Sequence, residues 1–390
     1  MASPLRIWAL VAWVLLLVGP AAAQRAQNVE REVWQARQWM SAGQQERANT
    51  LLTSILEKEP NNADALSLMG MLKAQQGKSD EAEQFLRRAI AAKPDSAPAW
   101  NGLGVLQLST KRYQGALETF EAGLKKNPHD QSLRRGEKQA ALLIAQQQID
   151  AREQEGALIS LLRASKYLPD DADLLTKLGI LEDRMKIFHD ADIALKRSNT
   201  LRPDDPTTLY ALAHLKTDQQ MPSEAATYMQ RYLALKPDDA SAHYGMGRIL
   251  RLAGKPDEAT KEYQRSIALQ PQQTESYYEL AEMAVNNKYD DQAEPLLQRV
   301  LARDPKHGGA LTEMGVIALR RKDYAKAEEY LRLAITNVPD YGPAHYQYAL
   351  ALSRLGRIEE AQQEFATASA LSRPPLEKSS GTVQLKEPER

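Results

Sequence analysis

The chain has 390 residues, a formal net charge of −1 at pH 7 and no cysteine. The balanced charge provides no overall field that would attract nucleic acid or a membrane surface, so we expect no nucleic-acid partner. The absence of cysteine excludes disulfides, thiolate zinc sites and a cysteine nucleophile.

The N-terminal segment, residues 1–23, has the layout of a secretory signal peptide. Arg6 provides the positive start, Ile7–Val18 is apolar, and Ala21–Ala23 forms an A-x-A cleavage motif. We expect cleavage after Ala23, because the apolar stretch is shorter than the roughly 20 residues that a spanning helix needs. The sequence therefore predicts an exported, periplasmic protein without a stable membrane span. Secretion, or anchoring by an uncleaved N-terminal segment, is the alternative.

Prolines recur at a fixed spacing along the rest of the chain. Every step between them has the same length, except for a longer step between Pro128 and Pro169. Self-similarity with a constant period indicates repeats, each of which is one supersecondary unit. These ladder prolines are Pro60, Pro94, Pro128, Pro169, Pro203, Pro237, Pro271, Pro305 and Pro339.

Two columns of small residues keep the same phase as the prolines. Two antiparallel helices approach closely only where a side chain is nearly absent, so these columns predict helical hairpins. The column that precedes the prolines at a constant distance, and continues past the last of them, is Ala48, Ala82, Ala116, Ala157, Ala191, Ala225, Ala259, Ala293, Ala327 and Ala361. The column that lies the same distance further upstream is Ala36, Gly70, Gly104, Ala145, Gly179, Ala213, Gly247, Ala281, Gly315 and Ala349.

The clearest repeat, residues 97–128, matches the pattern W-x2-L-G…A-x3-F…P. Its matching residues are Trp100, Leu103, Gly104, Ala116, Phe120 and Pro128. The chain therefore resembles the tetratricopeptide repeat (TPR) family over about residues 29–373. The resemblance implies an all-α fold, an α-solenoid in which helix–turn–helix units stack into a right-handed superhelix with a concave groove.

We expect about ten units within a solenoid that spans residues 24–373. A tail, 374–390, has little apolar content and is predicted to be disordered. The expected units are about 29–60, 63–94, 97–128, 131–169, 172–203, 206–237, 240–271, 274–305, 308–339 and 342–373.

The fourth unit contains seven extra residues, which lie between Pro128 and Ala145. Seven residues are close to two helical turns, so the first helix of this unit can lengthen without rotating its apolar face. A looped insertion around Asp130–Glu137 is the alternative, and Gly136 favours it.

The resemblance also implies where a partner would bind. In the family, the fifth and ninth residues of each unit tend to point into the groove. We predict a tyrosine ladder along it, which suits an extended peptide or a glycan. The alternative is that these tyrosines fill space between adjacent first helices. The predicted groove residues are Tyr210, His214, Tyr244, Arg248, Tyr278, Glu282 and Tyr346, with Thr312 at the fifth position of the ninth unit.

Motifs for catalysis, phosphate binding or metal binding are missing from the sequence, and the six histidines lack metal-site spacing. We therefore predict a non-enzymatic scaffold that binds protein or peptide segments, without a cofactor, metal or catalytic residue. One alternative is a carbohydrate-handling or exopolysaccharide export factor. Another is the accessory arm of a glycosyltransferase complex.

Overall fold

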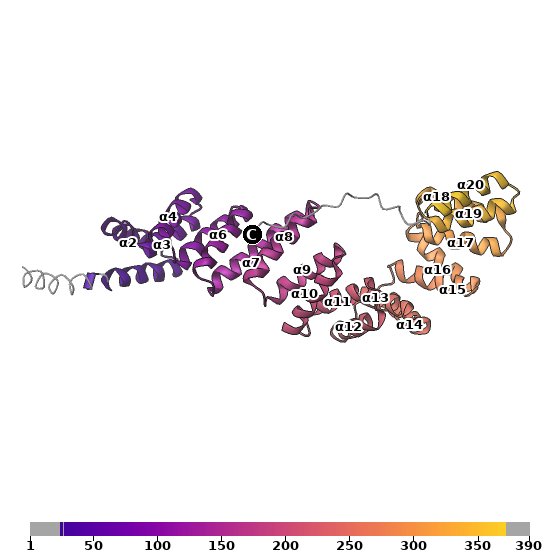
Figure 1. Cartoon of the computed structure of the whole chain (residues 1–390), viewed down its shortest axis with the longest axis horizontal. Helices are drawn as coiled ribbons and strands as arrows, with labels where there is room; N and C mark the ends of the chain where they lie inside the picture. The colour runs from indigo at the N-terminus through magenta and orange to yellow at the C-terminus, as the bar shows by residue number, and fades with distance from the viewer. Residues whose placement is uncertain (1–23, 26, 372–390) are drawn as a thin grey trace, which may run out of the picture. The chain divides into compact units, whose positions relative to one another are not determined.

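The computed structural model describes residues 24–25 and 27–371, and the regular structure in that range is entirely helical (Figure 1). Consecutive helices form hairpins, so the predicted all-α solenoid architecture is confirmed. The predicted signal peptide, residues 1–23, and the predicted disordered tail, residues 374–390, lie outside the described residues. No helix among the described residues is long and apolar enough to cross a membrane.

A helix over residues 27–41 precedes the labelled helices. The labelled helices are α2 (Gln45–Lys58), α3 (Ala63–Gln75), α4 (Ser79–Ala92), α5 (Ala97–Ser109), α6 (Tyr113–Lys126), α7 (Gln131–Asp150), α8 (Gln154–Tyr167), α9 (Ala172–Arg184), α10 (Phe188–Leu201), α11 (Pro206–Asp218), α12 (Pro222–Leu235), α13 (Ala240–Leu252), α14 (Pro256–Leu269), α15 (Glu275–Asn286), α16 (Asp290–Arg303), α17 (Gly308–Arg320), α18 (Tyr324–Asn337), α19 (Gly342–Arg354) and α20 (Ile358–Leu371).

The chain divides into two compact parts, which we call the N-terminal part, up to Ala211, and the C-terminal part, from Leu212. The division falls within α11. Each part is built from hairpins of the same kind.

The small-residue columns lie where the two helices of a hairpin touch. The ten alanines of the first column are all buried, with at most 1% of any of them exposed. A Cβ atom added to Gly247 would lie 2.5 Å from the Tyr263 ring, and one added to Gly70 would lie 2.6 Å from Leu86. Such distances leave no room for a side chain. This confirms that the close approach of the two helices requires small residues in the columns.

The turn inside each hairpin requires a residue in the left-handed conformation. Gly77 illustrates it with a φ of 76°, and the amide of Lys78 closes the turn onto the Lys73 carbonyl. Glycine adopts this conformation without steric cost, whereas other residues rarely do. Within the described residues, glycine nevertheless occupies only four of these turns, at 43, 77, 254 and 356, and the other six are Lys111, Arg152, Lys186, Gln220, Lys288 and Lys322.

The extra residues of the fourth unit lengthen its first helix. Helix α7 runs for 20 residues without a break, and Asp130 caps it by accepting a hydrogen bond from the Leu133 amide. The alternative of a looped insertion is therefore wrong. Gly136, which favoured a loop, lies instead where the Phe120 ring packs against α7 and leaves no room for a Cβ atom.

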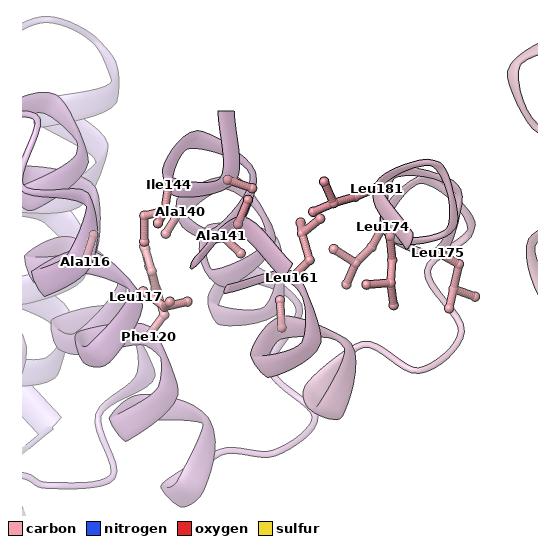
Figure 2. Packing of buried hydrophobic residues seen from close by; sticks show 14 of the residues in the cluster. Ala116, Leu117, Phe120, Ala140, Ala141, Ile144, Leu161, Leu174, Leu175 and Leu181 are labelled. Carbon is pink, nitrogen blue, oxygen red and sulfur yellow. The ribbon is translucent and has the colours of Figure 1, made fainter. Parts of the chain in front are cut away.

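The added turns join a continuous core in the N-terminal part. In Figure 2, Leu117 and Phe120 lie on one side of the helix that carries Ala140 and Ile144, and Leu161 lies on the other. The insertion therefore extends the core without interrupting it.

The carbonyl groups of several ladder prolines are contacted by a side chain of the next repeat. Proline fixes its own φ and ends the second helix, but its carbonyl still requires a donor. That donor is often the side chain six residues later, in the next first helix. The Trp100 indole donates to Pro94 (2.9 Å), the Arg134 guanidinium donates to Pro128 (3.0 Å), and His243 and His345 contact Pro237 (3.0 Å) and Pro339 (2.8 Å) through Nε2.

Candidate partner-binding face

The predicted tyrosines of the C-terminal part lie at matching positions on first helices. Tyr244 on α13 is half-buried, and its ring centroid lies 6.0 Å from that of Tyr263. Tyr346 on α19 is 49% exposed and makes an edge contact of 5.5 Å with Phe365. Each ring therefore packs against a neighbour and also keeps some exposed surface, so packing and an open surface coexist at these positions.

Tyr278 on α15 is half-buried. Its ring centroid lies 4.7 Å from that of His307, and its hydroxyl donates a hydrogen bond to Tyr341. Burial raises the pKa of Tyr278, and the nearby Tyr341 and Glu282 raise it further. The hydroxyl therefore stays protonated and able to donate at neutral pH.

The row of partly exposed fifth-position side chains is interrupted on α17, where the fifth residue is Thr312. Thr312 is 2% exposed, and its hydroxyl donates to the Gly308 carbonyl within its own helix at 2.8 Å. The hydroxyl thus finds its hydrogen-bond acceptor within its own helix, which is common for threonine in helices. The exposed tyrosine surface is therefore interrupted at α17.

Arg251 crosses from α13 to α15 and holds two carboxylates. One of its nitrogens lies 2.5 Å from both Glu279 and Glu282. Glu282 was predicted from its ninth position, whereas Arg251 and Glu279 were not. Their sequence separations, both close to one repeat, were the available signal, because residues about one repeat apart lie on adjacent first helices. Arg248, also predicted, is exposed on α13.

Glu313 on α17 is a candidate site residue that the sequence reasoning missed. Its side chain is half-buried, and burial, reinforced by the neighbouring charge of Glu282, raises its pKa to about 7. Arg320 opposes this shift, but that guanidinium already contacts Asp290 (2.6 Å) and the Val285 carbonyl (2.7 Å). Among the described residues, no hydrogen bond or ion pair reaches the Glu313 carboxyl.

The remaining predicted residues, Tyr210 and His214, lie on α11, where the two parts of the chain are divided. Tyr210 is half-buried and His214 is exposed. The face that we consider below lies wholly within the C-terminal part. We name it the first-helix face. It is made up of Tyr244, Arg248 and Arg251 on α13, Tyr278 and Glu282 on α15, and Glu313 on α17.

Comparison with protein families gives matches over much of the chain. Residues 217–345 match the family described as the cytochrome c-type biogenesis protein H TPR domain. Residues 40–106, 74–137 and 318–374 match the tetratricopeptide repeat family. A TPR repeat-containing protein of Dictyostelium discoideum is 32% identical over 65 residues, which are 17% of this chain and 25% of that protein. The chain thus spans about a quarter of the length of this relative.

Solved structures resemble the chain at low sequence identity. Yeast Tom70 is 16% identical, with a TM-score of 0.42, over 88% of this chain and 85% of that one. YrrB, a TPR protein with an unusual peptide-binding site, is 22% identical, with a TM-score of 0.39, over 47% of this chain and 95% of that one. Likeness at this level concerns the fold alone. The matched family models, together with the observed hairpins and small-residue contacts, show tetratricopeptide repeats over residues 40–137 and 217–374.

Proposed function

We propose that the chain is a non-enzymatic protein-interaction scaffold, and that its C-terminal part holds an extended partner segment along the first-helix face. The observation that carries this proposal is the arrangement of Tyr244 and Tyr278. Both rings are fixed by packing; the charge of Arg251 acts on Tyr244, and that of Glu282 acts on Tyr278. Rigid aromatic side chains next to charged groups bind extended peptides at a low entropic cost.

The test is retention of a randomised library of peptides about 12 residues long on the immobilised protein. Replacing both Tyr244 and Tyr278 by alanine should lower retention about tenfold, as expected for aromatic anchors. Tyr289→Ala is the matched control, because Tyr289 is 58% exposed and precedes a second helix. Circular dichroism checks that each variant stays helical. Equal retention by wild type and the double variant would contradict the proposal.

The alternative ligand, a glycan, gives a different result in the same design. Soluble oligosaccharides should then change tyrosine fluorescence saturably, whereas the peptide library should not be retained. That outcome would replace the peptide scaffold by a carbohydrate-handling role.

A second, narrower candidate is a role in cytochrome c-type biogenesis. The match of residues 217–345 to the TPR domain of a biogenesis protein favours it, and this range includes Tyr244 and Tyr278. Its test is selective binding of peptides that contain C-x-x-C-H, the haem-attachment motif of c-type cytochromes, over peptides with the same residues scrambled. Equal binding of both would exclude this role.

We also propose that the protein works outside the cytoplasm, in the periplasm. The arrangement of Arg6, Ile7–Val18 and Ala21–Ala23 supports export with cleavage after Ala23. N-terminal sequencing of the mature protein should begin at Gln24. A mature protein that begins at Met1 would indicate an uncleaved segment.

A further inference from the structure

The cations of the first-helix face are distributed unevenly. Arg251 holds both Glu279 and Glu282 at 2.5 Å. Arg320 holds Asp290 and the Val285 carbonyl. Arg248 is exposed on α13, where its charge acts on Tyr244. The carboxyl of Glu313 on α17 therefore has no cation of its own within the described part of the chain.

The surroundings of Glu313 are partly aromatic. The Tyr278 hydroxyl reaches α17 one turn before Glu313, because it lies 2.6 Å from the place of a Cβ atom added to Gly309. The same hydroxyl donates a hydrogen bond to Tyr341. A cationic side chain that reaches a half-buried carboxylate beside aromatic rings gains a charge-assisted hydrogen bond and a contact with the rings. An anionic side chain would be repelled by Glu313 and Glu282. The charge of this location thus selects one class of occupant.

On the basis of the function proposed above, we infer that the segment bound at the first-helix face carries a lysine or arginine side chain that pairs with Glu313. The occupant is thus a basic, extended protein segment rather than an acidic one or an apolar helix. In the unbound protein, burial without a cation disfavours the ionised carboxylate. Pairing with a cation favours ionisation, so binding near pH 7 releases a proton from Glu313.

The test compares two randomised peptide libraries that differ at one central position, which is lysine in one library and norleucine in the other. Norleucine keeps a similar aliphatic stem without the charge. The full chain should retain the lysine library about tenfold better, as expected for a partly buried charge pair. Glu313→Gln should abolish this preference. Glu329→Gln, which removes an exposed glutamate on the adjacent second helix α18, should preserve it.

A second measurement needs no variant. Calorimetric titration of the wild-type protein at pH 7 with the best-retained lysine peptide, in buffers of different ionisation enthalpy, should show net proton release. This measurement keeps the inference testable even if Glu313→Gln disturbs folding. Proton uptake, or no change in protonation, would contradict the pairing with Glu313.

The outcomes separate this inference from the proposed function. Equal retention of both libraries, lost on replacing Tyr244 and Tyr278 by alanine, would overturn the inference and leave the scaffold proposal standing. A lysine preference that persists in Glu313→Gln would also overturn the inference. Retention of neither library would count against both.

Discussion

Glu137 in the N-terminal part and Glu313 in the C-terminal part present the same chemistry in different surroundings. Burial raises the pKa of both carboxyls, to about 8 for Glu137 and about 7 for Glu313, and a neighbouring glutamate adds to each shift. Glu137 is 0% exposed, whereas Glu313 is half-buried. The missing partner therefore affects stability at Glu137, whereas at Glu313 it affects the binding that we propose.

The arginine next to Glu137 is already engaged. Arg163 on α8 forms two hydrogen bonds to Glu121 on α6, of 3.0 Å and 2.8 Å. Both carboxyl oxygens of Glu137 lack a hydrogen-bond partner among the described residues. Burying such a group as an ion is costly, so the folded chain keeps its proton. Accessibility to a partner, in addition to pKa, therefore distinguishes the two carboxyls.

The largest expected effect is that of Glu137→Gln on stability at high pH. Between the ordinary value of 4.5 and about 8, the unfolded chain has lost this proton while the folded chain holds it. The free energy of unfolding of the wild type therefore falls as the pH rises through this window. The variant lacks this loss and should be more stable at pH 9 by about 2–4 kcal/mol, but not at pH 4.

Urea unfolding followed by tryptophan fluorescence measures this effect. All tryptophans lie at or before Trp100, so their signal reports on the N-terminal part. A difference between wild type and variant that stays constant from pH 4 to pH 9 would show that Glu137 titrates normally. The contrast between the two carboxyls would then be lost.

Gly136→Ala tests whether the inserted turns belong to the core. The added methyl group would collide with the Phe120 ring, so we expect a loss of about 1–3 kcal/mol in the free energy of unfolding. Gly115→Ala is the matched control, because its Cβ atom would meet the Gln107 side chain at an acceptable 3.4 Å. The control should be stabilising, by up to about 1 kcal/mol. Equal changes in the free energy of unfolding for both variants would show that the Phe120 ring can move aside at little cost.

Replacing a non-glycine residue of a hairpin turn by glycine should raise stability equally in both parts. Arg152 and Lys288 adopt φ values of 64° and 63°, so replacing either by glycine should relieve strain and raise stability by about 1 kcal/mol. Hydrogen exchange measured by mass spectrometry reports on each part separately. A response in only one part would show that tertiary contacts, rather than backbone strain, govern these turns.

The smallest expected effect is that of Glu313→Gln on stability. The sign is the same as for Glu137, because the folded pKa is raised from 4.5 to about 7. Partial exposure to solvent reduces the magnitude to less than about 1 kcal/mol at pH 9. Hydrogen exchange of α17 at pH 5 and pH 9 provides the measurement. An effect as large as that of Glu137→Gln would mean that Glu313 is a core residue and not part of a binding surface.

The sequence predicted the repeat period, the helical hairpins and the buried small residues, because each follows from contacts inside one repeat. It did not decide how the fourth unit accommodates its insertion. Gly136 is typical of a loop, but its actual reason is the Phe120 ring, which lies on a different helix. The six non-glycine hairpin turns carried no recognisable signal, because lysine, arginine and glutamine are common throughout helices.

The candidate site was predicted less completely. The fifth and ninth positions indicated Tyr278 and Glu282, but not Arg251, Glu313 or Tyr341. Whether a charge on one helix reaches its neighbour depends on small helix rotations and rotamers, which the spacing of residues does not reveal. The hydrogen bond from Tyr278 to Tyr341 also joins residues that lie nearly two repeats apart in the sequence, so it does not follow from contacts between adjacent repeats.

The side-chain donors to the ladder prolines have a consequence for recombining repeats. Each proline and its donor belong to different repeats, as Pro94 and Trp100 show. Repeats that carry Trp100, Arg134 or His243 six residues after the preceding ladder proline should be interchangeable. Each of them supplies a hydrogen-bond donor for the carbonyl of whichever proline precedes it. Repeats with Leu175 or Leu311 at the same position lack this side-chain donor. A shuffled array that contains only repeats with such a donor should keep these hydrogen bonds between neighbouring repeats.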